Sequence, residues 1–381
     1  MPRMMFDFVD GSAGSEFGTR RNEREIERIQ LQPRVLVNVE NRRLDTTILG
    51  KETSLPFGIA PMGMCDLTWP GADRMLAAAA VQHEIPLCVS SAASTTLEEM
   101  HRLTGGKAWF QLYVGQSREA AFDLVDRAAG AGYEFLVLTV DTPQVSRRIR
   151  DLKNGFQVPF RMGPRQFLDF ACHPRWSLQT LMTGVPKPMN FETAQKSNAF
   201  ARSESRGGTD WRFLDALRNR WNGKLIIKGV MSPDDAVGIR DAGADAVYVS
   251  NHGGRQLDSA PAAIHALPQI RAAIGTDTPL IFDSGLRSGE DIVKALALGA
   301  DFVMLGRPLI YAIGADGARG LDSLIDYIAE DISITLAQIG RKAIGELDAS
   351  VLADPTLLPP APDSAPESGN SVIGKLRVEG R

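Results

Sequence analysis

A histidine and an arginine lie three residues apart in the segment SNHGGRQLD, at positions 252 and 255. Imidazole side chains titrate near neutral pH, so His252 could accept a proton, while the guanidinium of Arg255 could hold an anionic substrate. The two glycines between them let the backbone approach a ligand closely. A carboxylate such as Asp141 could orient the histidine and stabilise its protonated form. This segment predicts proton transfer on a negatively charged substrate.

Two later segments, DSGLRSG and LGRP, indicate a phosphate site. Each offers small residues and backbone N–H groups beside an arginine, Arg287 or Arg307, that could pair with a phosphate in a bidentate fashion. Lys228 follows a short apolar run, and a buried ammonium is costly unless a negative group faces it. We expect an anionic cofactor atom to face Lys228, and therefore a phosphorylated ligand or cofactor.

These residues lie at the ends of short apolar runs that alternate with alanine-rich amphipathic segments, which is the pattern of a parallel sheet. The runs are LPFGIAP (55–61), PLCVSS (86–91), WFQLYV (109–114), FLVLTVD (135–141), LIIKG (225–229), AVYVSN (246–251), PLIFDSG (279–285) and FVMLGRP (302–308).

Eight strands, each followed by a helix, predict a closed (β/α)8 TIM barrel, an α/β fold whose active sites lie at the carboxyl ends of the strands. A doubly wound sheet rarely needs eight such units, and the Gly-x-Gly-x-x-Gly turn of dinucleotide folds is absent after the first run. Polar residues gather at the predicted strand ends: Ser90, Gln111, Tyr113, Thr139, Asp141, Lys228, Ser250, His252, Asp283, Gly306 and Arg307.

The composition is that of a globular protein of 381 residues with 44% hydrophobic residues and a net charge of −4, which argues against nucleic acid as the main partner. The three cysteines are too few and too scattered for a disulfide framework or a metal site. The opening residues lack the apolar region of a signal peptide, and no segment has the roughly 18 apolar residues of a membrane span. We expect a cytoplasmic location.

The regular spacing fails once, after the fourth strand, where an insertion occupies about residues 142–208. In a barrel, this connection lies over the active-site face. We predict one barrel domain over residues 1–345, with an N-terminal extension and this insertion, followed by a partly irregular C-terminal extension over 346–381 that is rich in proline and serine.

The ordered set of motifs resembles the FMN-dependent α-hydroxy acid oxidases and dehydrogenases, the family of glycolate oxidase and the flavin L-lactate and mandelate dehydrogenases. The likeness covers roughly residues 2–345. It is carried by PRMMFDFVDGSAGSE, LDTTILG, IAPMG, FQLYV, LTVDTP, RRIRDLKN, IIKGV, SNHGGRQLD, DSGLRSG and LGRP.

The resemblance implies a role for each matching residue. His252 would be the base, Asp141 its partner, Arg255 the main clamp for the substrate carboxylate, Arg148 a second arginine near the substrate, and Tyr113 a donor to the substrate. The implied FMN-binding residues are Pro61, Met62, Gly63, Ser90, Gln111, Thr139, Lys228, Ser250, Asp283, Ser284, Gly285, Arg287, Gly306 and Arg307.

Two positions depart from the family pattern. Phe8 stands where the family has a tyrosine whose hydroxyl helps bind the substrate carboxylate, and a lost charge-assisted hydrogen bond is worth roughly 1.5–3 kcal/mol. Ala92 stands where glycolate oxidase has a tryptophan over the substrate, which suggests room for an aryl or longer alkyl side chain. The resemblance therefore implies oxidation of a 2-hydroxy acid to a 2-oxo acid, with the substrate side chain open.

The resemblance leaves the electron acceptor open between a quinone, a cytochrome and oxygen. Gly63 stands where several quinone-linked dehydrogenases have glycine and many oxidases have alanine, which favours a dehydrogenase. Tetramers are common in the family, so a homotetramer is expected. The insertion has two interpretations: it caps the site, or it docks on the cytoplasmic face of the inner membrane. Its apolar and basic residues are Trp176, Leu178, Leu181, Met182, Met189, Arg175 and Lys187.

Two alternatives to a 2-hydroxy acid dehydrogenase stay open besides an oxygen-using oxidase. One is an FMN barrel that oxidises another substrate class, which the replacement at Phe8 motivates. The other is a barrel without catalytic activity that serves as a binding protein. The presence of His252, Asp141, Lys228 and Arg255 together argues against the latter.

Overall fold

A computed structural model describes residues 1–115, 117–156, 162–192 and 207–354. Within these ranges, eight parallel strands form a barrel, in the order β3-β10-β9-β8-β7-β6-β5-β4. A bridge between Ile59 and Leu87 joins β3 to β4. The predicted (β/α)8 TIM barrel is confirmed. Its strands are β3 (Phe57–Ile59), β4 (Cys88–Ser90), β5 (Trp109–Leu112), β6 (Phe135–Thr139), β7 (Lys224–Val230), β8 (Ala246–Val249), β9 (Leu280–Phe282) and β10 (Phe302–Leu305).

The strands form from continuous apolar runs because both of their faces are buried. Alternate residues of β6 show this division: Val137 points into the barrel with Trp109 and Phe302, whereas Leu136 and Leu138 pack against the surrounding helices. The interior is therefore a packed core below the carboxyl ends of the strands.

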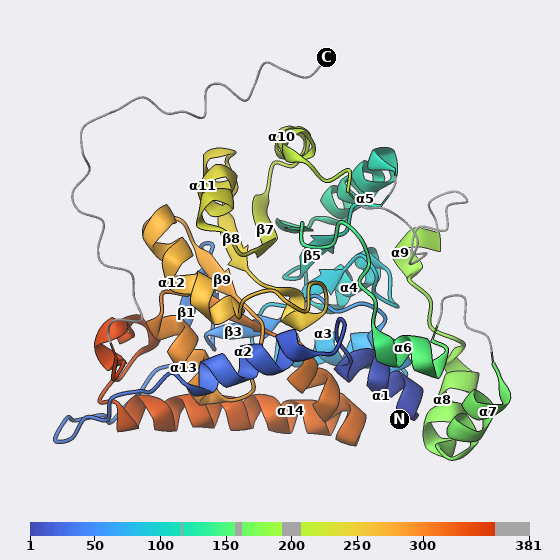
Figure 1. Ribbon diagram of the computed structural model, residues 1–381, viewed down its shortest axis with the longest axis horizontal. Helices are drawn as coiled ribbons and strands as arrows, with labels where there is room; N and C mark the ends of the chain where they lie inside the picture. Colours follow the sequence, from blue (N-terminus) through green and yellow to red (C-terminus); the bar gives the residue numbers. More distant parts are fainter. Residues whose placement is uncertain (116, 157–161, 193–206, 355–381) are drawn as a thin grey trace.

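Helices surround the barrel (Figure 1). Hydroxyl or carboxylate side chains cap the first turns of several of them. Ser117, Asp210, Ser232 and Ser288 each accept a hydrogen bond from a backbone N–H of the helix that follows. The helices are α3 (Ala72–Gln82), α4 (Leu97–Leu103), α5 (Arg118–Ala131), α10 (Trp211–Arg220), α11 (Pro233–Asp241), α12 (Ala263–Ile274), α13 (Gly289–Ala297) and α14 (Arg307–Gln338), with short 3-10 turns η1 (Cys65–Leu67), η2 (His252–Gly254), η3 (Ile344–Glu346) and η4 (Ala349–Val351).

The N-terminal extension covers both ends of the barrel. The hairpin of β1 (Thr46–Ile48) and β2 (Lys51–Thr53) places Ile48 against the barrel interior. Helices α1 (Arg3–Asp10) and α2 (Phe17–Glu27) lie instead at the carboxyl end, where α2 contacts η2. Gly254 permits this contact, because it has a φ of +77° and a Cβ there would lie 2.5 Å from the backbone nitrogen of Thr19.

The insertion contains α6 (Ile149–Asn154), α7 (Pro164–Ala171), α8 (Pro174–Thr183) and α9 (Met189–Glu192). Helix α6 packs on α1, whereas α7 and α8 lie together at one edge of the molecule (Figure 1). Trp176 does not share the exposure of its neighbours: it is buried and donates from Nε1 to the carbonyl oxygens of Leu67 and Thr68. The expectation that Trp176 belongs to an exposed apolar surface is therefore wrong.

Leu178, Leu181 and Met182 of α8 are exposed, at 60%, 79% and 79%. Phe167 and Leu168 of α7 extend the same apolar character, at 59% and 64%. Among the helices that the structure describes, none has the length and hydrophobicity that crossing a membrane requires.

The C-terminal extension is described as far as Asp354, so the prediction for 355–381 lies outside the described residues. The domain boundary at residue 345 stays a prediction.

Candidate active site

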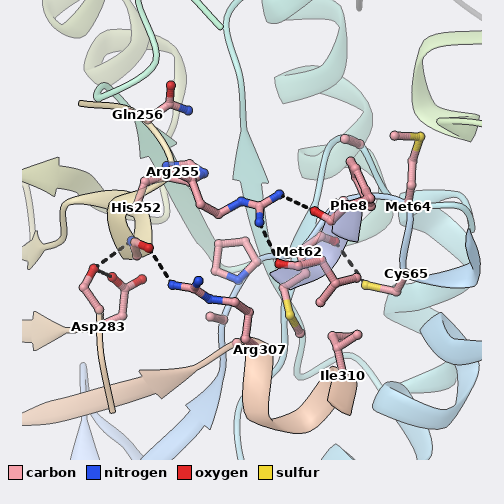
Figure 2. A pocket seen from close by; sticks show the side chains of 18 of the residues that line it. Phe8, Met62, Met64, Cys65, His252, Arg255, Gln256, Asp283, Arg307 and Ile310 are labelled. Carbon is pink, nitrogen blue, oxygen red and sulfur yellow. Dashed lines mark hydrogen bonds between the residues drawn. The ribbon is translucent and has the colours of Figure 1, made fainter. Parts of the chain in front are cut away.

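A cavity of about 700 Å³ opens at the carboxyl end of the barrel (Figure 2). The carboxyl ends of all eight strands, or the loops that follow them, contribute to its wall, together with α1 and α6. The lining residues include Phe8 and Val9; Ala60 to Cys65; Ala92; Tyr113; Thr142, Val145, Arg148, Leu152, Gly155 and Phe156; Lys228; His252, Gly253, Arg255 and Gln256; Asp283 to Arg287; and Met304 to Pro308.

His252 lies at the edge of this cavity between an acid and a phenol. Its Nδ1 lies 3.0 Å from Oδ1 of Asp141, and its Nε2 lies 3.3 Å from the hydroxyl of Tyr113. Nδ1–H donation to the carboxylate leaves the lone pair at Nε2, which is the tautomer that a base requires. The three residues from the ends of β5, β6 and β8 are thus brought together as the sequence predicted, although their roles stay proposals.

The backbone of His252 is held in the left-handed region, with a φ of +58°. Its N–H donates to Oγ of Ser250 at 3.0 Å, and the N–H of Gly253 donates to Oγ of Ser284 at 3.0 Å. Ser284 itself has a φ of +90°. Such conformations persist only where surrounding contacts fix them, so the loop after β8 is held by the loop after β9.

Lys228 and Asp283 form a buried ion pair, with 2.7 Å between Nζ and Oδ2. Burial raises the pKa of Asp283, but the charge and hydrogen bond of Lys228, with donation from Ser250 and Ser284, leave that pKa below its ordinary value. The expectation that an anionic cofactor atom compensates Lys228 needs correction, because Asp283 already supplies the negative charge. Both residues still line the cavity.

Three predicted cofactor residues form a hydrogen-bonded row across neighbouring strands. Ser90 donates to Gln111 at 2.9 Å, and Gln111 donates to Thr139 at 2.9 Å. These three residues and Ser250 are buried. They lie behind the residues that line the cavity and are not themselves part of its lining.

Arg307 and Arg287 form the cationic end of the cavity. Arg307 donates to the carbonyl oxygens of Gly253 and Asp10, at 2.5 and 3.4 Å, whereas Arg287 pairs with Glu23 at 2.5 Å. Burial lowers the pKa of Arg307, and the charge of Arg287 lowers it further. A buried guanidinium against carbonyl dipoles, at the N-terminus of α14, favours an anionic ligand.

Arg255 is turned toward the N-terminal helix (Figure 2). Its Nη1 donates to the carbonyl oxygens of Val9 and Gly11 at 2.7 and 2.6 Å, and its Nη2 donates to that of Phe8 at 3.0 Å. Burial lowers the pKa of Arg255 well below its usual value, with a further contribution from the charge of Arg148. Arg255 thus holds α1 besides lining the cavity, a contact that the sequence motif alone did not predict.

Phe8 lies between two guanidinium groups, with Cζ of Arg148 and Cζ of Arg255 each 5.9 Å from its ring centroid. The ring of Phe156 lies 4.6 Å from that of Phe8. The position that lacks the family hydroxyl is therefore an aromatic wall flanked by two positive charges. Phe156 could not be predicted from local pattern, because its position depends on how the insertion packs on α1.

Two residues with small side chains, Gly63 and Ala92, line another part of the cavity. A Cβ at Gly63 would lie 2.9 Å from Cβ of Ala92. Both Pro61 and Met62 lie beside this pair in the wall. The loops after β3 and β4 thus approach closely enough that an alanine at position 63 would require one of them to shift.

Fold and site together define a TIM barrel whose cavity holds a histidine paired with a carboxylate and, in another part of the wall, a group of arginines. The family model for FMN-dependent dehydrogenases matches residues 1–354. The chain is 39% identical over 367 residues to (S)-mandelate dehydrogenase of Pseudomonas putida, covering 95% of this chain and 93% of that protein. It is 36% identical over 360 residues to L-lactate dehydrogenase of Pseudomonas syringae pv. syringae (strain B728a), covering 92% and 94%.

Solved structures agree with this relationship. A monotopic membrane protein, (S)-mandelate dehydrogenase, superposes with a TM-score of 0.88 at 39% identity, covering 92% of this chain and 95% of that chain. A mandelate oxidase variant with (S)-mandelic acid has a TM-score of 0.77 at 32% identity, covering 91% and 92%. The chain belongs to the FMN-dependent dehydrogenase family.

The cavity fits FMN, the cofactor of this family. Arg307 and the glycines at positions 285 and 306 offer cationic and backbone donors suited to a phosphate, and the ammonium of Lys228 also lines the cavity. When bound, FMN supplies the electron acceptor that amino-acid side chains lack.

Proposed function

We propose that this protein oxidises a 2-hydroxy acid with an aryl or longer alkyl side chain to the 2-oxo acid, with FMN as the electron acceptor. The observation that carries this proposal is His252 at the cavity edge, held between Asp141 and Tyr113, with arginines on the neighbouring wall. The two mandelate-acting relatives support an aromatic substrate, as does the wall formed by Phe8 and Phe156.

The residues of the chain bind the substrate and move a proton. Arg148 and Arg255 attract the substrate carboxylate, and Tyr113 donates a hydrogen bond to its hydroxyl or carboxylate. Nε2 of His252 then takes a proton, while Asp141 orients the imidazole and stabilises its positive charge. The substrate loses two protons and two electrons in all, and the product is the 2-oxo acid.

The cofactor is held from both ends of the cavity in this proposal. Lys228 faces the pyrimidine edge of the flavin, and Arg307 with Arg287 takes the phosphate. The remaining residues proposed to contact or support FMN are Pro61, Met62, Gly63, Ser90, Gln111, Thr139, Ser250, Asp283, Ser284, Gly285 and Gly306.

Anaerobic mixing with a panel of 2-hydroxy acids tests the proposal. The absorbance of an oxidised flavin near 450 nm should bleach with mandelate or a longer 2-hydroxy acid, and more slowly with glycolate. A yellow protein that none of these acids bleaches would overturn the proposal. The second candidate, an FMN barrel acting on another substrate class, would then lead, because Phe8 removes a donor from the substrate site.

The substitution Phe8→Tyr should lower KM for the preferred 2-hydroxy acid about tenfold, with kcat little changed. The new hydroxyl adds one hydrogen bond to the carboxylate, worth roughly 1.5–3 kcal/mol. Steady-state kinetics with an artificial electron acceptor measures the change. Phe156→Tyr is the matched control, because it adds a hydroxyl to the neighbouring ring. An unchanged or raised KM in Phe8→Tyr would show that the carboxylate does not reach this position.

We infer that the physiological acceptor is a quinone or a similar membrane carrier, with oxygen as the alternative. Gly63 and its close approach to Ala92 support a dehydrogenase, and so does the relative described as a monotopic membrane protein. We further propose a cytoplasmic homotetramer that touches the cytoplasmic face of the inner membrane. Readmitting air or a soluble quinone to the reduced protein distinguishes the two acceptors.

The proposed membrane contact is the exposed apolar surface of α7 and α8, formed by Phe167, Leu168, Leu178, Leu181 and Met182. Arg165, Arg175 and Lys187 provide basic side chains on and beside these helices. Insertion of apolar side chains, with attraction of basic ones to anionic lipid, is the usual basis of interfacial binding.

The double substitution Leu181→Ser and Met182→Ser should weaken binding to phosphatidylglycerol-containing vesicles by roughly tenfold or more, because each buried apolar side chain contributes about 1.5–3 kcal/mol. Co-sedimentation of the protein with vesicles measures this loss. Ile334→Ser, at an exposed apolar position of α14, is the control and should leave binding unchanged. Equal vesicle binding by the wild-type protein, the double variant and Ile334→Ser would show that this surface is not the membrane contact.

A further inference from the structure

Tyr248 is a fully buried side chain of β8 inside the barrel. Its hydroxyl donates to Oδ2 of Asp283 at 2.8 Å. Nζ of Lys228 lies 4.4 Å from the centroid of its ring. Tyr248 thus contacts both members of the ion pair that faces the cavity. In the sequence it lies two positions before Ser250, on the inward-pointing register of the strand, but its identity alone gave no signal for a role.

The carboxylate of Asp283 accepts four hydrogen bonds. Oδ1 accepts from Ser250 and Ser284, at 2.5 and 2.8 Å. Oδ2 is shared by Lys228 and Tyr248, at 2.7 and 2.8 Å. The ammonium and the phenol therefore compete for one oxygen, and the phenol withdraws negative charge that would otherwise bind Lys228 alone.

We propose that Tyr248 is a positioning residue that sets how much positive charge the Lys228–Asp283 pair presents to bound FMN, and so sets the reduction potential of the flavin. The inference rests on the proposed placement of the flavin at Lys228. It assigns a role in tuning the cofactor to a residue that does not line the cavity.

The direction of the effect follows from the two contacts. Without the phenol, Oδ2 carries more negative charge and holds Lys228 more strongly, so the pair presents less positive charge to the cavity. Because reduction places negative charge on the flavin, reduction then becomes less favourable. Burial and the charge of Asp283 raise the pKa of Tyr248 well above its ordinary value, so the phenol remains a donor throughout the working pH range.

The test is the potential of FMN in the holoenzyme of Tyr248→Phe, measured by reductive titration with dithionite against a reference dye. This variant keeps the ring and removes the hydroxyl. We expect the equilibrium constant for two-electron reduction to fall about tenfold, which is a potential lower by about 30 mV. Tyr248→Met also removes the hydroxyl, so it should lower the potential as well, and it serves if the phenylalanine variant does not fold.

Tyr133→Phe is the matched control. Tyr133 is also buried, and its hydroxyl donates to the carbonyl oxygen of Leu97 at 2.7 Å, in the helical layer outside the barrel. It should lose stability as Tyr248→Phe does while keeping the wild-type potential. Wild-type potentials in both Tyr248 variants would overturn the inference and leave Tyr248 a structural residue.

The dithionite titration uses no substrate, so it separates the two proposals. A lowered potential in a protein that no 2-hydroxy acid reduces would support the role of Tyr248 and reject the proposed function. Bleaching of the wild-type protein by a 2-hydroxy acid, together with wild-type potentials in both Tyr248 variants, would support the proposed function and reject the role of Tyr248. A wild-type protein that does not bind FMN would overturn both.

Discussion

We expect the substitution His252→Asn to lower the rate of flavin reduction by about a thousandfold while FMN stays bound. A positioned general base contributes roughly a hundredfold to ten-thousandfold to rate, and the amide that replaces the imidazole cannot accept a proton. Nε2 of His252 is the atom removed, beside Tyr113, and Asp141 loses the group that it orients. We expect the substrate KM to change much less than kcat.

Asparagine is a better replacement than glutamine because of the backbone at this position. His252 has a φ of +58°, and asparagine adopts that left-handed region more readily than most residues. His252→Gln therefore serves as the second variant: similar losses in both show that the imidazole, and not backbone strain, is responsible.

Anaerobic stopped-flow mixing with excess substrate measures the effect as the decay of absorbance near 450 nm. His265→Gln is the control, since His265 is an exposed residue that pairs with Glu25 outside the cavity. It should retain wild-type reduction. Rapid reduction in His252→Asn would reject His252 as the base.

We expect Arg307→Met to weaken FMN binding by about a hundredfold or more. Two charge-assisted hydrogen bonds to a phosphate are worth roughly 1.5–3 kcal/mol each, and each 1.4 kcal/mol is a tenfold change in Kd. Arg307 is buried at the start of α14 and donates to two carbonyl oxygens. Within the described residues no carboxylate lies at ion-pair distance from Arg307, whereas Arg287 pairs with Glu23.

Arg287→Met is the matched control for this prediction. Arg287 lies in the same end of the cavity but pairs with Glu23 at 2.5 Å, so its loss should weaken FMN binding less than tenfold. Fluorescence titration of the apoprotein with FMN measures both dissociation constants. Equal effects of the two substitutions, or none, would show that Arg307 is not the principal phosphate ligand.

The barrel could be predicted because its strands are buried on both faces and leave continuous apolar runs in the sequence. The proximity of His252, Asp141 and Tyr113 followed from the same rule, since the carboxyl ends of all eight strands meet at one face. The local sequence pattern was sufficient to predict the position of a residue wherever that position depended only on the strand that carries the residue.

The remaining contacts depend on packing between distant segments. Trp176 looked like a membrane-facing residue, but the insertion folds back and buries it under the loop after β3. Asp283 was predicted as an FMN-binding residue, and the structure shows that it also forms an ion pair with Lys228. No local signal distinguishes these outcomes, because each arises from tertiary contacts far apart along the chain.

Helix α1 has a consequence for how the protein is made. Carbonyl oxygens of its last turn and of the residue that follows accept hydrogen bonds from Arg255 and Arg307, and the side chain of Asp10 accepts one from Tyr311. These contacts join α1 to residues about two hundred and fifty to three hundred positions further along the chain, so they form only after Tyr311 has been synthesised. Because α1 and Arg307 both line the cavity, we expect FMN to bind only once the chain has been synthesised through Arg307.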